Sequence, residues 1–201
     1  MDKIIADWLL TDPAVIGGHR SKCIGKPLAV GTGPDASIRF NGSGDGIFLD
    51  ANPLAGLKEF TVEAVFRPER GGPETQKFMH FGADSGDRFL FETRLPDPGN
   101  WCFDAALHSG EPSLALMDPD LLHPLDCWYH AAVSFGGLQM ITYINGKQEL
   151  SGRIEAFGPL AGKQTSIGVR MDLNSWFRGE IRRIRISGGV LGPGAFLDPD
   201  S

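Results

Sequence analysis

Cysteine is scarce in this sequence, and its few cysteines are not spaced as a disulfide framework or a zinc site. The chain of 201 residues has three, Cys23, Cys102 and Cys127, with neither CxxC spacing nor paired histidines. An odd number without such spacing argues against disulfide-stapled folds and zinc-binding folds. We therefore expect no metal site, and reduced thiols that serve as small buried apolar side chains.

Excess positive charge and long apolar runs are also missing. The formal net charge is -6, whereas a general nucleic-acid binder needs a basic face to displace counterions. No apolar stretch approaches the length that spans a bilayer, and residues 1–8 lack the basic flank and long apolar run of a secretory signal. The sequence as written predicts a cytoplasmic protein without nucleic-acid or membrane partners, or a secreted one if its leader was removed.

Several catalytic motifs are absent as well. The sequence contains no GxSxG, no HExxH and no glycine-rich phosphate loop, which excludes the enzyme classes built on them. It also lacks a Glu-x-Asp-x-Glu run, although a retaining glycosidase needs two carboxylates about 5 Å apart across one glycosidic bond. A hydrolase would have to combine Glu63 or Glu92 with Asp104 from different strands.

Glycine and proline are frequent instead, with 27 and 14 residues spread along the chain. They separate short runs in which apolar and polar side chains alternate, a pattern typical of half-buried antiparallel strands. No run has a helical period. We expect two packed sheets, built from strands over residues 37–40, 46–49, 60–67, 77–81, 88–94, 101–108, 128–135, 140–144, 166–171 and 179–187.

The chain is predicted to form one domain, because all-β sandwiches reach this length without dividing. Residues 37–197 would form the sandwich, residues 1–36 are less regular and would wrap its edge, and residues 198–201 would be a frayed tail. Asn145-Gly146 tolerates the positive φ angles of a tight turn, which predicts a hairpin between residues 140–144 and 148–150.

Three segments resemble, in the same order, parts of the bacterial laminin G-like jelly-roll domains, which are relatives of pentraxins and legume lectins. The first is FTVEAVFRP (60–68), similar to an early strand of the family. The second is WYHAAVSF (128–135) with YINGK (143–147), and the third is SIGV (166–169) with WFRGEIRRIRI (176–186). The resemblance implies an all-β, two-sheet antiparallel jelly roll of the concanavalin A-like kind, a fold that carries lectins, adhesion modules, hydrolases and lyases.

The same family commonly has an acidic residue directly after the isoleucine of its closing strand, often associated with a structural calcium ion. In this sequence Arg182 stands at that position. We therefore do not carry calcium over as an expected cofactor.

Side chains alternate between the two faces of a strand, so each expected strand can be divided into a core set and an opposite set. Apolar residues fill the core sets, as Phe60, Val62 and Phe66 do. If the strands share a sheet, the opposite positions form one candidate ligand-binding face with Glu63, Arg67, Arg88, Glu92, Arg94, Asp104, His108, His130 and Arg170. Arginine binds carboxylate or sulfate at two points, so we expect a polar groove for an acidic or hydroxyl-rich ligand.

These residues also have plainer interpretations. If the strands belong to two different sheets, the charged side chains form ordinary surface ion pairs. His108 and His130 could each be an acid or base near neutral pH, or structural strand residues. Trp176 could be a platform on which a sugar ring stacks, or a side chain packed at the rim of the core.

The favoured function is that of a lectin-like module that binds a carbohydrate on a polar sheet face. The alternative is an enzyme, a polysaccharide lyase or glycoside hydrolase, that acts on an acidic saccharide with His108, His130, Glu92 and Asp104 as catalytic candidates. A protein-interaction module is the third. Loss of glycan binding on replacement of Arg94 or Arg170, or appearance of unsaturated products, would separate these classes.

Overall fold

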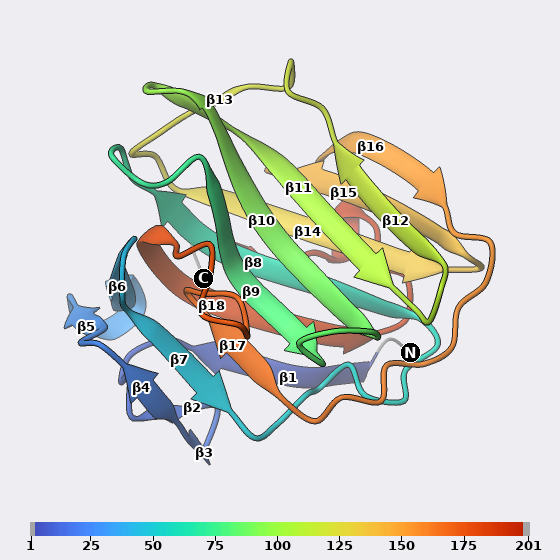
Figure 1. Cartoon of the computed structure of the whole chain (residues 1–201), viewed down its shortest axis with the longest axis horizontal. Coiled ribbons are helices and arrows are strands. Elements are labelled where there is room, and N and C mark those ends of the chain that lie inside the picture. Colours follow the sequence, from blue (N-terminus) through green and yellow to red (C-terminus); the bar gives the residue numbers. More distant parts are fainter. Residues whose placement is uncertain (1–2, 199–201) are drawn as a thin grey trace.

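A computed structural model describes residues 3–198 of the chain, and its regular structure is almost entirely β-strand. Two large antiparallel sheets pack face to face (Figure 1). The prediction of a two-sheet antiparallel β-sandwich is confirmed. Within the described residues the helical turns are two short 3₁₀ segments, Gly33–Asp35 and Pro193–Ala195, and no helix there has the length and apolar character that a membrane crossing requires.

The first sheet is built around β8 and β18, which lie side by side at its centre. β1 pairs with the second half of β18, and β6 pairs with its first half. The strand order is β16 (Lys147–Arg153), β15 (Gln139–Ile144), β14 (Tyr129–Gly136), β8 (Phe60–Pro68), β18 (Arg178–Gly188), β6 (Ser37–Asn41) and β5 (Leu28–Val30), with β1 (Lys3–Leu9) beside β18.

The second sheet has its longest strands, β9 to β11, at one side and shorter strands at the other. Its order is β12 (Ser113–Met117), β11 (Asn100–His108), β10 (Arg88–Asp97), β9 (Thr75–Gly82), β17 (Thr165–Ile167), β7 (Gly46–Leu49) and β4 (Lys22–Ile24), with β13 (His123–Pro124) beside β11. A separate small hairpin joins β2 (Val15–Ile16) and β3 (His19–Arg20). Neighbouring strands are therefore brought together from distant parts of the sequence.

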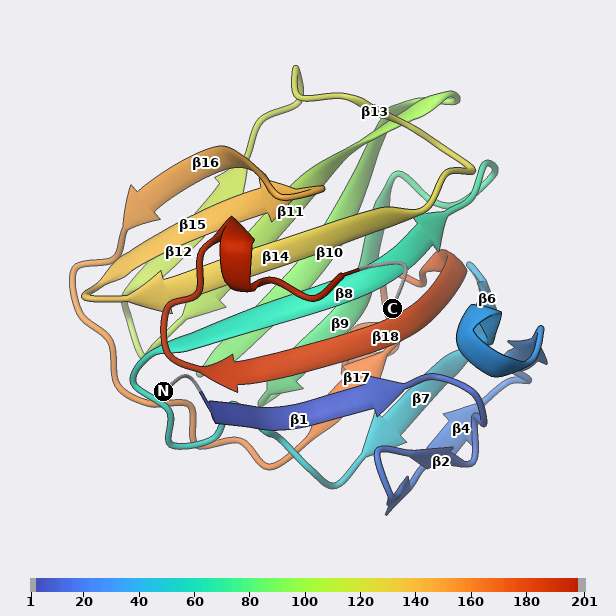
Figure 2. The same cartoon turned by 180° about the vertical axis from the view of Figure 1, so that it is seen from behind.

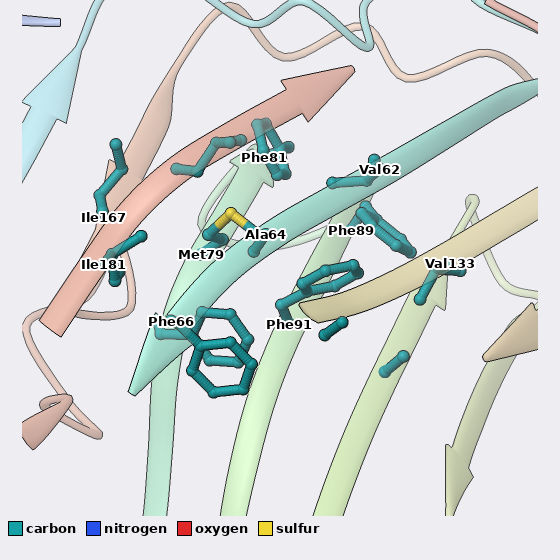
Figure 3. Close-up of a cluster of buried hydrophobic side chains, with 14 of the residues drawn as sticks. Val62, Ala64, Phe66, Met79, Phe81, Phe89, Phe91, Val133, Ile167 and Ile181 are labelled. Atoms are coloured by element: carbon teal, nitrogen blue, oxygen red, sulfur yellow. The ribbon is translucent and has the colours of Figure 1, made fainter. Parts of the chain in front are cut away.

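Alternation along the strands fills the space between the sheets with apolar side chains (Figure 3). Phe60, Val62 and Phe66 of β8 are fully buried, as the period-two pattern predicts. The rings of Phe66 and Phe78, from opposite sheets, stack with centroids 4.4 Å apart. Aromatic side chains bury large apolar areas, so this contact ties the two sheets together at the centre of the core.

The hairpin predicted at Asn145-Gly146 is confirmed. Both residues have positive φ angles, 49° and 73°, and Ile144 pairs directly with Lys147 across the turn. Two successive positive φ angles match the twist of the flanking strands. The hairpin connects β15 to β16 at the edge of the first sheet.

One predicted strand is too long. β17 ends at Ile167 rather than Met171, because Gly168 turns the chain with a φ of 81° and packs so closely on Phe40 that a Cβ would lie 2.2 Å from the ring. A loop over residues 168–177, called here the crossing loop, follows. Met171 continues the alternation of Ile167 and Val169, which predicts a core position, but it lies half-buried at the surface.

The two ends of the chain contribute differently. Residues 3–36, for which irregular structure is expected, supply β1 and the outermost strands β4 and β5. The predicted tail of residues 198–201 lies outside the described residues apart from Asp198. Residues 189–198, called here the C-terminal segment, lie across β8 and β14 on the side away from the core (Figure 2).

The cysteines are free thiols, but only Cys102 is buried. The expectation of burial is wrong for Cys23, on the edge strand β4, and for Cys127, in the connection that leads into β14. Burial, followed by the charge of Asp104, raises the pKa of Cys102 to about 11, so this thiol stays protonated near neutral pH.

Candidate functional site

The candidate residues do not share one face, because the strands that carry them belong to different sheets. Glu63, Arg67 and His130 lie on the outer face of the first sheet, the face turned away from the second sheet. The rest belong to the second sheet or to the crossing loop, and they are Arg88, Glu92, Arg94, Asp104, His108, Arg170 and Trp176. The hypothesis of a single face is therefore corrected for the first three.

Glu63 and His130 are buried beneath the C-terminal segment. His130 Nε2 lies 3.1 Å from Glu63 Oε1, Arg185 Nε donates to Glu63 Oε2 at 2.7 Å, and the Leu197 N–H donates to Oε1 at 2.7 Å. Phe196 packs on His130 with ring centroids 5.5 Å apart. Since Glu63 is 0% exposed and His130 3%, neither reaches a ligand, and both hold the C-terminal segment in place.

Arg67 takes part in a second structural network on the first sheet. Its Nη2 lies 2.6 Å from Glu180 Oε1 and 2.8 Å from Glu69 Oε1. Glu180 is buried and also accepts a hydrogen bond from Ser37. The carboxylates of Glu69 and Glu180 therefore neutralise the Arg67 guanidinium within the protein.

The position that holds an acidic residue in calcium-binding relatives does not fit a metal ion here. The Arg182 guanidinium lies 4.3 Å from the centroid of the Trp128 ring, where it adds a positive charge. Across residues 3–198, no group of three or more His, Cys, Asp or Glu side chains is placed to hold a metal. The donor set that calcium requires, several carboxylate or carbonyl oxygens, is not assembled at this site.

The outer face of the second sheet carries its polar side chains in rows that follow the strand register. One row runs from Lys77 to Glu92 and Asp104. The next runs through Lys22, Phe48, Ser166, His80 and Leu90. Because paired residues point to the same face of a sheet, both rows are presented on the side away from the core.

Glu92 and Asp104 face each other across β10 and β11 and are neutralised by two cations. Lys77 Nζ lies 2.8 Å from Glu92 Oε2, and Arg94 Nη2 lies 3.2 Å from Glu92 and 2.7 Å from Asp104. Burial raises the pKa of Glu92, against the effect of Lys77. Both carboxylates are less than a twentieth exposed, so in this arrangement neither flanks a glycosidic bond in the way glycoside hydrolysis requires.

Arg88 and His108 face each other one row further along β10 and β11, beyond the row that contains His80 and Leu90. Arg88 Nη2 lies 3.2 Å from His108 Nε2, and Arg88 Nη1 donates to the Gly86 carbonyl at 2.9 Å. Burial lowers the pKa of His108, and the charges of Arg88 and Arg170 lower it further. His108 is therefore a neutral acceptor for Arg88 near neutral pH.

His80 was not among the predicted site residues, although it lies at the centre of this face. Its Nδ1 accepts the Met171 N–H at 3.3 Å and its Nε2 lies 2.8 Å from the Ala83 carbonyl. Burial lowers the pKa of His80 to about 4. The neutral ring therefore fixes the crossing loop to β9. The sign of this role in the sequence is that His80 takes an outward position in the predicted strand over residues 77–81.

The buried neutral ring predicts a pH dependence of stability. In the unfolded chain the His80 imidazole accepts a proton at its ordinary pKa of 6.5, whereas in the folded chain it stays neutral down to about pH 4. The contribution of neutral His80 to folding stability is therefore complete above pH 6.5 and is lost as the pH falls towards 4. Denaturant unfolding at pH 7, 6, 5 and 4 measures it. His80→Asn should flatten this part of the profile, whereas His19→Gln, at an exposed histidine, should not; equal slopes in all three proteins would contradict the assignment.

A pocket of about 440 Å³ opens on the outer face of the second sheet, beside this row. Phe48, the outward residue of β7, lies half-buried in its wall. Gln164 Nε2 donates to Asp50 Oδ1 at 3.1 Å at one side. We call it the Phe48 pocket; its other lining residues include Arg20, Lys22 and Met171.

The sequence patterns did not select the residues of the Phe48 pocket. Alternation in the strand 46–49 already places Phe48 opposite the core residues Ile47 and Leu49, so an outward aromatic side chain was the one available signal. Arg20 and Lys22 belong to a segment expected to be irregular. Trp176 is half-buried beside β7, where a Cβ on Gly46 would lie 3.5 Å from its ring.

The comparisons with known proteins agree with this architecture. Residues 41–194 match the family model described as the concanavalin A-like lectin/glucanases superfamily, a laminin G type of domain. The chain belongs to this family. A search of curated proteins finds no match.

Solved structures share the jelly-roll fold at low sequence identity. Domain 4 of AbnA, a GH43 extracellular arabinanase from Geobacillus stearothermophilus solved in complex with arabinotriose, has a TM-score of 0.74 and 20% identity, over 100% of this chain and 99% of that domain. The botulinum neurotoxin serotype D binding domain has a TM-score of 0.70 and 17% identity, over 95% of this chain and 49% of its own. The binding domain of Paraclostridial Mosquitocidal Protein 1 has a TM-score of 0.70 and 16% identity, over 95% of this chain and 50% of that domain. This chain thus spans about half of these two binding domains. The predicted concanavalin A-like jelly roll is confirmed.

Proposed function

We propose that this protein is a carbohydrate-binding module whose ligand sits in the Phe48 pocket. The observation that carries the proposal is the pocket itself, an aromatic side chain surrounded by polar groups on an open sheet face. Ligand sites of about 300–1,000 Å³ combine apolar walls with a few placed polar groups. A sugar ring offers the matching surfaces, because its C–H face packs on an aromatic ring and its hydroxyl groups form hydrogen bonds.

The groups around Phe48 suit hydroxyl recognition. Asp50 and Gln164 are held together by one hydrogen bond and are both exposed, so their remaining acceptors and donors face solvent. Arg20 and Lys22 add two cations to the lining of the pocket. These cations favour a saccharide that carries acidic groups over a neutral one.

The complex of the AbnA domain with arabinotriose supports a saccharide as the class of ligand. An enzymatic role has less support, because Glu92 and Asp104 are buried in ion pairs and His130 lies beneath the C-terminal segment. The burial of these three catalytic candidates therefore favours saccharide binding over saccharide cleavage.

The test is a binding titration with a panel of oligosaccharides, arabinotriose and trigalacturonic acid among them. We expect saturable binding measured by calorimetry, without any new reducing end or unsaturated product in the same sample. A panel with no binding at all would contradict the proposal, and product formation would establish the enzymatic alternative. Binding of a protein partner alone would favour an interaction module.

A further inference from the structure

Arg88 is a half-buried strand arginine whose charge has no ion-pair partner among the described residues. Among those residues Arg178 on β18 makes no ion pair either, but its Nε donates to the Arg70 carbonyl, whereas Arg88 Nε has no acceptor. Other strand arginines, such as Arg39, Arg67, Arg94 and Arg185, each pair with a carboxylate. The Arg88 side chain lies on the outer face of the second sheet. Its hydrogen bonds go to a carbonyl and an imidazole, Gly86 O and His108 Nε2, and neither neutralises the charge.

A second guanidinium lies close to Arg88. Burial lowers the pKa of Arg88, and the charge of Arg170 lowers it further. The charges of Asp84, Glu92 and Asp172 raise this pKa, but none of these carboxylates forms an ion pair with Arg88, and Asp172 is paired with Arg170 at 2.8 Å. The Nε–H groups of Arg88 and Arg170 are both buried without an acceptor among the described residues.

His108 adds a third donor. Because its Nε2 accepts from Arg88 Nη2, the ring proton belongs on Nδ1 in the neutral form. No hydrogen bond within the described part of the chain uses Nδ1. Two guanidinium groups and one N–H therefore lie on this part of the face, and the Arg88 guanidinium has no carboxylate at ion-pair distance among the described residues.

The position of this group relates it to the Phe48 pocket. Arg170 directly precedes Met171, which lines the pocket. On the sheet, the row from Phe48 through Ser166 and His80 reaches Leu90, two residues from Arg88. Three strand spacings of about 4.8 Å separate β7 from β10, so a ligand longer than one sugar ring is needed to reach both.

We propose that Arg88, with Arg170 and His108, binds the acidic group of a saccharide, a carboxylate or a sulfate. The inference rests on the proposed function, since it specifies the charge of the ligand in the Phe48 pocket. A guanidinium fork holds two oxygens of such a group at once. A half-buried cation without a counter-charge is the feature that an anionic ligand would stabilise.

The test uses inorganic sulfate and two trisaccharides, trigalacturonic acid and its carboxyl-reduced neutral form. Side-chain NMR signals of Arg88 and His108 are followed in the sulfate titration, and the trisaccharides are titrated by calorimetry. We expect sulfate to shift both signals, and trigalacturonic acid to bind more tightly than the neutral form. Arg88→Gln should abolish the sulfate shifts of His108 and weaken trigalacturonic acid about 10- to 100-fold, as loss of charge-assisted hydrogen bonds does.

The controls separate a direct contact from a folding defect and from failure of the proposed function. Arg153→Gln, at an exposed arginine on β16 of the other sheet, should change neither result, and Arg88→Lys should restore part of the affinity by returning the charge without the fork. Absence of any sulfate shift at Arg88 and His108, or equal loss of acidic and neutral trisaccharide in Arg88→Gln, would overturn the inference. Sulfate shifts without any saccharide binding would keep the anion site and reject the carbohydrate proposal.

Discussion

Replacement of Glu63 by alanine is expected to destabilise the protein by about 3–5 kcal/mol, the cost of leaving a buried charge without its partner. Glu63 is 0% exposed and accepts hydrogen bonds from His130, Arg185 and Leu197. Its loss leaves the Arg185 guanidinium without the carboxylate and the Leu197 N–H without its acceptor. Denaturant unfolding measures the change.

The control for this variant is Glu155→Ala, at an exposed glutamate, which should alter the unfolding free energy by less than about 0.5 kcal/mol.

Burial raises the pKa of Glu63, but hydrogen bonds from His130, Arg185 and the Leu197 N–H outweigh it and lower the pKa below its ordinary 4.5. A lowered folded-state pKa stabilises the protein above the ordinary value and ceases to do so as the pH falls below it. A Glu63→Ala protein as stable as wild type would show that the C-terminal segment is not held by this contact.

Replacement of Phe48 by alanine is expected to weaken saccharide binding about 30-fold, or about 2 kcal/mol, as removal of an anchoring aromatic side chain does. Phe48 points away from the core, whereas its neighbours Ile47 and Leu49 are 0% and 1% exposed. The fold should therefore survive the change, and calorimetric titration with the best ligand of the panel measures the loss.

The matched control is Leu122→Ala, which removes an exposed apolar side chain far from the pocket, beside β13. It should leave affinity unchanged. An unchanged affinity in Phe48→Ala, with thermal unfolding like that of wild type, would mean that the ligand does not contact this ring.

The fold was predictable because alternation is a local property that the sandwich preserves. Phe60, Val62 and Phe66 alternate with outward residues, and each sits in the core. The prediction of a strand over residues 166–171 was wrong after Ile167, where a single glycine turns the chain. Alternation continues through Ile167, Val169 and Met171, but Gly168 with a φ of 81° ends the strand, and alternation does not detect a single positive φ.

The candidate site was only partly predictable because the alternation of apolar and polar residues does not show which strands pair. Glu63 and Glu92 occupy equivalent outward positions in their strands, yet one lies beneath the C-terminal segment and the other on the second sheet. The Phe48 pocket needs β4, β7 and the crossing loop together, three segments far apart in the sequence. The long-range register decides which polar side chains meet, and only the structure supplies it.

The most direct test of the proposed function is a titration of ¹⁵N-labelled protein with trigalacturonic acid, followed through the backbone amide signals. We expect shifts at Lys22, Phe48, Gln164 and Met171 around the pocket, continuing to Arg88 and His108. Shifts confined to the first sheet, around His130 and Phe196, or no shifts for this or any other saccharide, would contradict the proposed function.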